Sequence, residues 1–269
     1  MRRVAIAAPV RLISQIQTAD RFREGANAGM KPLFYENLVA LSAARHGHVR
    51  LRTPLDFGFA ARSNAVPLNL AEIPLAAQWY PIAFTSADTP CPMAVLGLRE
   101  GENLFVNEAG AWLEGAYVPT YVRRFPFLLA EQRAGEVLCI EERPDVVSAV
   151  DGQPLFGEDD QPSELVRAAL RLCRSAKAAD AATIPFVQAL AELDLLDART
   201  ATVKLSDGSR LAVSGFLTIE ETRFRALRDE DFLDLRRRGW LAAIYAQLQS
   251  TLNWARLADL AQASAAAAA

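Results

Sequence analysis

Short apolar runs separated by turn-forming residues occupy the chain from residue 32 to about residue 150, a pattern typical of strands and loops. Residues 94–98 and 104–106 flank the sequence Arg-Glu-Gly-Glu-Asn, and this spacing predicts a hairpin. Residues 137–140 predict a further short buried strand. This part of the sequence therefore favours a strand-rich N-terminal half with hairpins.

A loop rich in glycine and acidic residues, 151–160, precedes a second half with a different pattern. Apolar positions there recur every three or four residues, which predicts helices packed on one face. Pro162 and Glu164 mark the first helix start, and Gly239 ends the last short helix. The predicted helices cover residues 161–176, 185–193, 220–228 and 231–238.

Two further elements complete the predicted second half. Asp207-Gly208 separates the apolar residues 203–205 from 210–213, and this dipeptide favours the tight turn of a β-hairpin. From Trp240 onward, apolar residues at helical spacing predict a long terminal amphipathic helix. Its apolar stripe can pack on the core or can form a homodimer interface, and the pattern leaves both open.

The predicted fold class is therefore α+β, with a strand-rich N-terminal half and a helix-rich C-terminal half that contains one β-hairpin. Residues 1–30 are interpreted as an N-terminal extension. Residues 31–262 form a single predicted domain, strand-rich over 31–150 and helix-rich over 161–262. The alanine run at 263–269 is expected to be a frayed tail.

Composition limits the functions that such a domain can have. A net charge of −3 gives no general attraction to nucleic acid, and no run approaches the roughly 20 apolar residues of a membrane span. Three cysteines at long spacings indicate a reducing compartment, so a cytoplasmic location is expected. Two histidines exclude a metal site built from several imidazoles. We predict no metal and no cofactor.

Arginine and aromatic residues concentrate in residues 112–127. An extended conformation would place Arg124 on the face opposite Tyr117, Tyr121, Arg123, Phe125 and Phe127. Arginine can stack on aromatic rings while its guanidinium binds a carboxylate or phosphate. The candidate ligand-binding residues are Trp112, Tyr117, Tyr121, Arg123 and Arg124. The alternative is an arginine buried against an acidic side chain, joining strand to helix.

His46 is a further candidate, either as a general base in the same pocket or as a metal ligand together with His48. Residues two apart do not converge on a helix, so a hydrogen-bonded or solvent-facing loop histidine is the alternative. The sequence contains no nucleophile elbow, dinucleotide fingerprint, P-loop or HExxH motif. No catalytic residue is assigned, and the pattern favours a protein that is not an enzyme.

Residues 115–127 contain Tyr-Val-Pro, Arg-Arg and Pro-Phe elements. Further segments are residues 32–35, 41–42 followed by His46, 79–81, 152–156, 195–196, 207–208, 215–216 and the leucine-rich end with Gly239 and Ser250. They span nearly all of the chain from Pro32 to Leu260. Together, and in the same order, these segments resemble the SapC-like family of bacterial proteins, named from surface-layer loci, and residues 115–127 are the most diagnostic of them.

The resemblance implies a cytoplasmic accessory protein of a surface-layer, secretion or uptake system that acts by binding a protein or peptide. The family has no agreed catalytic residues, and its members occur near genes for outer-membrane uptake receptors and flavin-dependent halogenases. The alternative is an enzyme or small-molecule binder with an Arg- and Tyr-lined anion pocket, in a halogenase-associated modification pathway.

Overall fold

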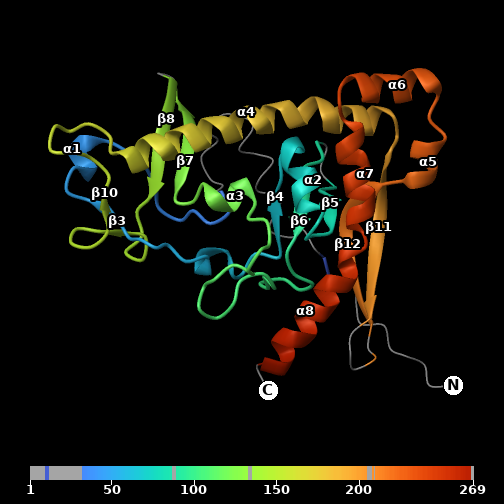
Figure 1. Cartoon of the computed structure of the whole chain (residues 1–269), viewed down its shortest axis with the longest axis horizontal. Helices are drawn as coiled ribbons and strands as arrows, with labels where there is room; N and C mark the ends of the chain where they lie inside the picture. Colours follow the sequence, from blue (N-terminus) through green and yellow to red (C-terminus); the bar gives the residue numbers. More distant parts are fainter. Residues whose placement is uncertain are drawn as a thin grey trace.

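The computed structural model of the chain describes residues 10–11, 32–86, 89–132, 135–204, 208 and 210–267. Most of the predicted extension, residues 1–30, lies outside these residues. Figure 1 shows an elongated molecule in which one long helix, α4 (Glu164–Glu192), runs along the top of two groups of strands. The predicted α+β class is confirmed, with strands before α4 and mostly helices after it.

The largest sheet has six strands in the order β1-β12-β5-β6-β4, and β11 also pairs with β12. These strands are β1 (Val10–Arg11), β4 (Ala65–Pro67), β5 (Ile82–Phe84), β6 (Pro92–Val95), β11 (Leu196–Lys204) and β12 (Arg210–Ile219). The predicted hairpin at Asp207-Gly208 is confirmed, because β11 and β12 pair antiparallel with Lys204 opposite Arg210. Residues 205–207 and 209 of its turn lie outside the described part.

The predicted hairpin over residues 94–106 is wrong. All four residues of β6 are buried, and β6 has β4 on one edge and β5 on the other. No edge of β6 is left for residues 104–106, which form no strand within the described chain. Leu104 N–H donates one hydrogen bond to Leu96 O, at 2.9 Å.

Two smaller sheets lie at the other end of the molecule, in the orders β2-β8-β7 and β10-β3-β9. Their strands are β2 (Leu38–Ala40), β3 (Arg50–Leu51), β7 (Phe127–Gln132), β8 (Gly135–Glu141), β9 (Val147–Ser148) and β10 (Gln153–Pro154). The buried strand predicted at residues 137–140 is confirmed as the second half of β8, where Cys139 and Ile140 are buried.

Short helices connect these strands. They are α1 (Ala43–His46), the 3-10 turns η3 (Gly58–Ala60) and η4 (Leu70–Glu72), α2 (Ile73–Ala76) and α3 (Thr120–Arg123). The helices after the hairpin are α5 (Glu221–Arg225), α6 (Asp229–Arg237), α7 (Leu241–Ser250) and α8 (Asn253–Ala267). Within the described residues, no helix combines the length and apolar character needed to cross a bilayer.

One helix, α4, contributes to both hydrophobic cores. Its first half places Val166 and Cys173 in the core of the two small sheets, and its second half places Phe186 and Leu190 in the core of the large sheet. The separate helix predicted at residues 185–193 is therefore wrong: Pro185 lies inside α4. Burial of the side chains on both sides of Pro185 compensates for the backbone hydrogen bond that proline cannot make.

The terminal helix is divided by a turn at Thr251 and Leu252. α7 buries Ile244 against the large sheet, while α8 buries Leu257 and Ala258. Trp254 of α8 packs against Phe216 in a tilted arrangement, with ring centroids 5.5 Å apart. Part of the apolar stripe predicted from Trp240 onward therefore packs in the hydrophobic core. α8 continues to Ala267, into the alanine run.

Candidate functional site

The segment that carries the predicted arginines is not extended. Pro119 precedes a single helical turn, α3, and this turn brings residues three apart together. Arg123 thereby lies beside Thr120, and Arg124 stacks on Tyr121. The predicted common face of alternate residues along 117–127 is therefore wrong.

Glu72, at the end of η4, anchors this segment. Its side chain is only 5% exposed, and Oε1 accepts hydrogen bonds from the Tyr117 hydroxyl at 2.7 Å and from Thr120 N–H at 2.6 Å. Oε2 accepts from the backbone and side-chain nitrogens of Asn69 at 3.1 and 2.6 Å. Four donors thus satisfy the buried carboxylate. Sequence reasoning missed Glu72, although Asn-x-x-Glu is the spacing of a capping box.

Arg123 is the exposed arginine of the pair. Its Nη2 donates to Thr120 Oγ1 at 2.8 Å and to the Tyr117 hydroxyl at 3.2 Å, and its Cζ lies 5.6 Å from the Tyr117 ring centre. Burial and the hydrogen bond to Glu72 raise the pKa of Tyr117, so this phenol is a neutral donor. Among the described residues, no carboxylate comes within ion-pair distance of Arg123.

Arg124 points into the molecule. Its Cζ lies 4.1 Å from the centre of the Tyr121 ring, and the guanidinium interacts with Tyr35 and with the charge of Asp180 on α4. Its Nε atom is buried and makes no hydrogen bond within the described part of the protein. Burial raises the pKa of Tyr121. This position suits an arginine that ties α3 to α4.

Trp112 connects to the same segment through Tyr80. The Trp112 indole N–H donates to the Tyr80 hydroxyl at 3.1 Å, and that hydroxyl donates to the carbonyl of Tyr117. Both aromatic rings belong to the core of the large sheet. Trp112 therefore positions the Tyr80 hydroxyl, which in turn holds the backbone of Tyr117.

His46 lies elsewhere, in α1 beside the small sheets. Its ring is fully buried, with Nε2 3.0 Å from Oε1 of Glu142, and Nδ1 accepts from Ser42 N–H at 3.2 Å. Arg45 pairs with the same carboxylate at 2.6 Å. His48 is exposed, so the two imidazoles do not converge. Among the described residues, no three metal-binding side chains lie together.

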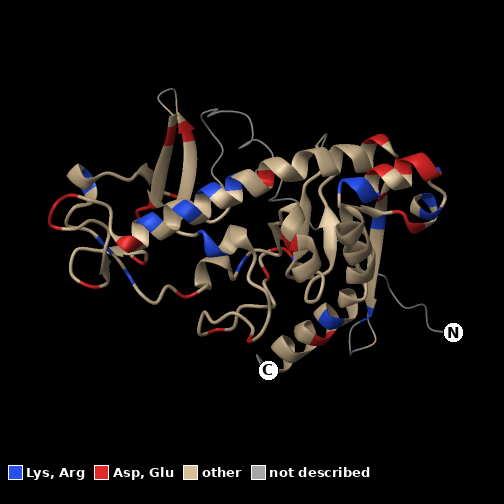
Figure 2. Cartoon of the chain, turned by 45° about the horizontal axis from the view of Figure 1, so that its top comes forward, with Lys and Arg blue, Asp and Glu red and all other residues tan. Residues whose placement is uncertain are grey.

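Basic residues along the first half of α4 form a visible stripe (Figure 2), but acidic partners accompany them. Arg171 lies 2.7 Å from Glu164, and Lys177 lies 2.8 Å from Glu136 of β8. These ion pairs neutralise the stripe locally. It is therefore a weak candidate for binding phosphate backbones.

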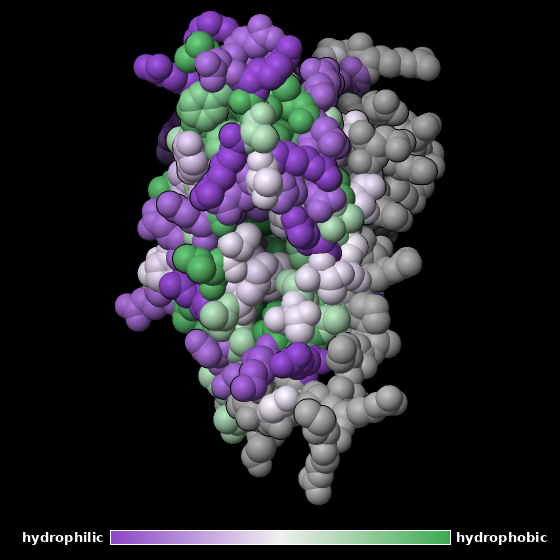
Figure 3. Space-filling model, turned by 90° about the vertical axis from the view of Figure 1, so that its right-hand side faces the viewer, coloured by the Kyte–Doolittle hydropathy of each residue, from purple (hydrophilic) through white to green (hydrophobic). Residues whose placement is uncertain are grey.

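A surface hollow of about 740 Å³ lies between α5, α6 and α7, and sequence reasoning missed it. We call it the α5–α7 hollow. Its apolar lining consists of Phe224, Leu227, Phe232, Tyr245, Leu248 and Leu252. Figure 3 shows hydrophobic surface in this region bordered by hydrophilic residues. Arg123 and Arg124 are not among its lining residues.

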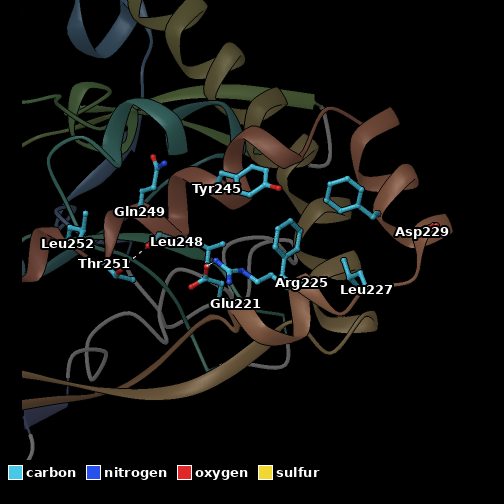
Figure 4. A pocket seen from close by; sticks show the side chains of 11 residues that line it. Glu221, Arg225, Leu227, Asp229, Tyr245, Leu248, Gln249, Thr251 and Leu252 are labelled. Atoms are coloured by element: carbon cyan, nitrogen blue, oxygen red, sulfur yellow. Dashed lines mark hydrogen bonds and ion pairs between the residues drawn. The ribbon is translucent and has the colours of Figure 1, made fainter.

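Aromatic rings form the floor of the α5–α7 hollow. The buried ring of Phe224 lies 5.5 Å from Tyr245 and 6.0 Å from Phe232, measured between ring centroids. Tyr245 is 48% exposed and Leu252 is 80% exposed. Figure 4 shows Leu227, Tyr245 and Leu248 around this space.

The charged groups of the hollow come from α5 and the start of α6, while Gln249 and Thr251 add uncharged polar groups from α7 and the turn after it. Glu221 and Arg225 form an ion pair at 2.6 Å. Asp229, the first residue of α6, has no ion-pair partner among the described residues. The available signal in the sequence was the apolar content of α7, because Tyr245, Leu248 and Leu252 form a second stripe beside the one that contains Ile244.

The comparisons with known proteins give a family. The SapC family profile matches residues 41–257, which include most of both hydrophobic cores, α3 and the α5–α7 hollow. No curated protein and no solved structure matches the chain. Because the match spans most of the 269 residues, the chain belongs to the SapC family.

Proposed function

We propose that the chain binds another protein or a peptide, as a cytoplasmic accessory component of a bacterial surface-layer, secretion or uptake system. The single observation that carries the binding function is the α5–α7 hollow, which leaves Tyr245 and Leu252 largely exposed. Family membership supports the biological setting.

The composition of the hollow favours a macromolecular partner. Phe224, Tyr245 and Leu248 supply aromatic and aliphatic surface, while charged side chains stand at the edge. Protein interfaces have this arrangement of an apolar centre inside a polar rim. Covering apolar surface gains about 25 cal/mol per Å². A partner that covers the hollow therefore removes unfavourable surface from water.

The polar groups make a small-molecule site less suitable. Binding sites for small molecules usually hold several convergent polar groups inside an apolar cavity. In the hollow, Glu221 and Arg225 already satisfy each other, and the Thr251 hydroxyl donates to Leu248 O. The polar side chains that remain are Gln249 of α7 and Asp229 at the start of α6. The floor, which contains Phe224, offers apolar contact.

Site-specific photo-cross-linking in cells tests this function. A photoreactive amino acid replaces Leu252 in one variant and Val150 in the other. These side chains are 80% and 79% exposed and belong to different parts of the fold, the turn between α7 and α8 and the loop between β9 and β10. We expect a defined protein adduct from position 252 only. Equal adducts from both positions, or none from position 252 when the photoprobe is active, would contradict the proposal.

Arg123 favours a second candidate function, which is anion binding by an enzyme or small-molecule binder in a halogenase-associated modification pathway. Its guanidinium is oriented by Thr120 and Tyr117 and lacks an ion pair among the described residues. Calorimetric titration with phosphate and with a small dicarboxylate tests it. Saturable binding that Arg123→Met abolishes supports this candidate, and the absence of binding by wild type removes it.

A further inference from the structure

We infer that the α5–α7 hollow receives an amphipathic helix of the partner, with apolar residues at helical spacing and a basic residue facing Asp229. This inference rests on the proposed binding function and adds the conformation and charge of the bound segment. It follows from the dimensions of the hollow, the state of its backbone groups and its unpaired charge.

The length of the hollow fits a short helix. Its lining follows α7 from Tyr245 and continues through the turn at Thr251 and Leu252, a length of about 10 Å at 1.5–2 Å per residue. α5 and α6 supply the facing wall, and the Phe224 ring lies between the walls. Two turns of a helix cover this length and present apolar side chains at positions i, i+3 or i+4, and i+7.

The backbone of the hollow also favours a helix over a peptide that binds as a β-strand. Such a peptide adds a strand to a sheet edge, where main-chain groups are available. The lining residues belong to α5, α6, α7 and the turns beside them, and no strand contributes to the lining. A helix satisfies its own backbone and needs only side-chain contacts.

The charge of the hollow selects a basic partner. Glu221 and Arg225 cancel each other at 2.6 Å, and neighbouring Arg228 is neutralised by Glu230 at 2.6 Å. Asp229 therefore carries the unpaired charge among the described lining residues. A lysine or arginine on the partner helix complements this carboxylate and orients the helix in the hollow.

A second copy of this chain fits the same surface poorly. In a twofold dimer whose axis passes through this patch, the hollow of one copy faces the hollow of the other. The floor around Phe224 would then remain uncovered. A convex helix from another protein fills that space.

Selection from a displayed library of random 16-residue peptides tests the inference. Peptides are enriched on the wild-type protein after peptides that bind the support alone have been removed, so the selection itself does not favour any variant. We expect enriched sequences with apolar residues at helical spacing and at least one lysine or arginine. Fluorescence anisotropy of the labelled peptides then gives Kd for each variant.

The expected changes in Kd are specific. Leu252→Glu and Leu248→Ser weaken binding about tenfold or more, which corresponds to 1.4 kcal/mol or more. Asp229→Asn weakens it about threefold, an effect that high salt removes. Glu230→Gln is the matched control at the adjacent, ion-paired position and leaves Kd unchanged.

Three results would overturn the inference. Enriched peptides that bind the hollow without helical spacing, or with acidic residues in place of basic ones, leave the proposed function standing and reject a basic helix. Peptide binding that is insensitive to Leu252→Glu and Leu248→Ser rejects both the binding function of the hollow and the inference of a basic helix. A solution mass of a dimer that Leu252→Glu converts to a monomer assigns the hollow to a second copy.

Discussion

The hydroxyl of Tyr117 donates a 2.7 Å hydrogen bond to the buried carboxylate of Glu72, which lies 45 residues earlier in the chain. The same oxygen accepts from Thr120 N–H at 2.6 Å, so Glu72 holds the segment that leads into α3 together with the first residue of that turn. The segment that carries Arg123 and Arg124 is therefore positioned by an acidic residue outside it.

Replacing this carboxylate should destabilise the fold. Glu72→Gln places an amide nitrogen among the donors Tyr117, Thr120 and Asn69, so at least one buried donor loses its acceptor. We expect a loss of about 2 kcal/mol in the free energy of unfolding, measured by urea denaturation. Glu114→Gln, an exposed position in the same region, should change it little; equal effects would exclude an anchoring role.

Substitutions of the two adjacent arginines should change the free energy of unfolding by different amounts. Arg124→Met removes a buried guanidinium from Tyr121 and from the charge of Asp180, and we expect a loss of about 2 kcal/mol or more. Arg123→Met, at an exposed position, should cost under about 1 kcal/mol. Thermal and urea denaturation of both variants measure the difference. A larger loss for Arg123 would reverse the assigned roles.

Glu142 should contribute a pH-dependent part of the stability. Arg45, and to a smaller extent His46, hold the pKa of Glu142 below its ordinary value of 4.5. The stabilisation is therefore complete above the unfolded-state pKa and is lost as the pH falls through the lower folded-state pKa. The difference in stability between wild type and Glu142→Gln should be about 0.5–1 kcal/mol at pH 7.

Urea denaturation at a series of pH values tests that difference, which should shrink as the pH falls below 4.5. Glu100→Gln, at an exposed position without a salt bridge among the described residues, is the control and should give a small, pH-independent difference. A constant difference for Glu142→Gln across the acid range would show that the ion pair contributes nothing.

Some side chains of the α5–α7 hollow should stabilise the fold, and others should be available to contact a partner. Phe224→Ala removes a ring that is 4% exposed, and we expect a loss of about 3 kcal/mol in the free energy of unfolding. Leu252→Ser acts on a side chain that is 80% exposed and should change stability by less than about 0.5 kcal/mol. A large loss for Leu252→Ser would mean that this leucine serves the fold.

The sequence predicted the elements whose signals are local. Asp207-Gly208 lies between two apolar runs and identified the β11–β12 hairpin, and Gly239 has the positive φ of +74° that suits the end of α6. The α+β class and the family followed from patterns spread over the whole chain. Such features can be predicted because their signals lie in neighbouring residues or in the order of segments along the chain.

Features that depend on distant contacts were not predictable in the same way. The turn of α3 is held by Glu72, and α4 continues through Pro185 because packing on the large sheet outweighs the lost hydrogen bond. The α5–α7 hollow was missed because helical spacing does not reveal which of two apolar stripes on α7 faces the core. Burial of Ile244 and exposure of Tyr245 resolve that ambiguity.

The most direct test of a binding role for the hollow uses the protein identified by cross-linking from position 252. Its affinity for the purified chain is measured by calorimetry with wild type and with Leu252→Glu, after both show the same melting temperature. We predict that the substitution weakens Kd about tenfold or more, because it places a charge in an apolar contact. Equal affinities for the two proteins would contradict a binding function for the α5–α7 hollow.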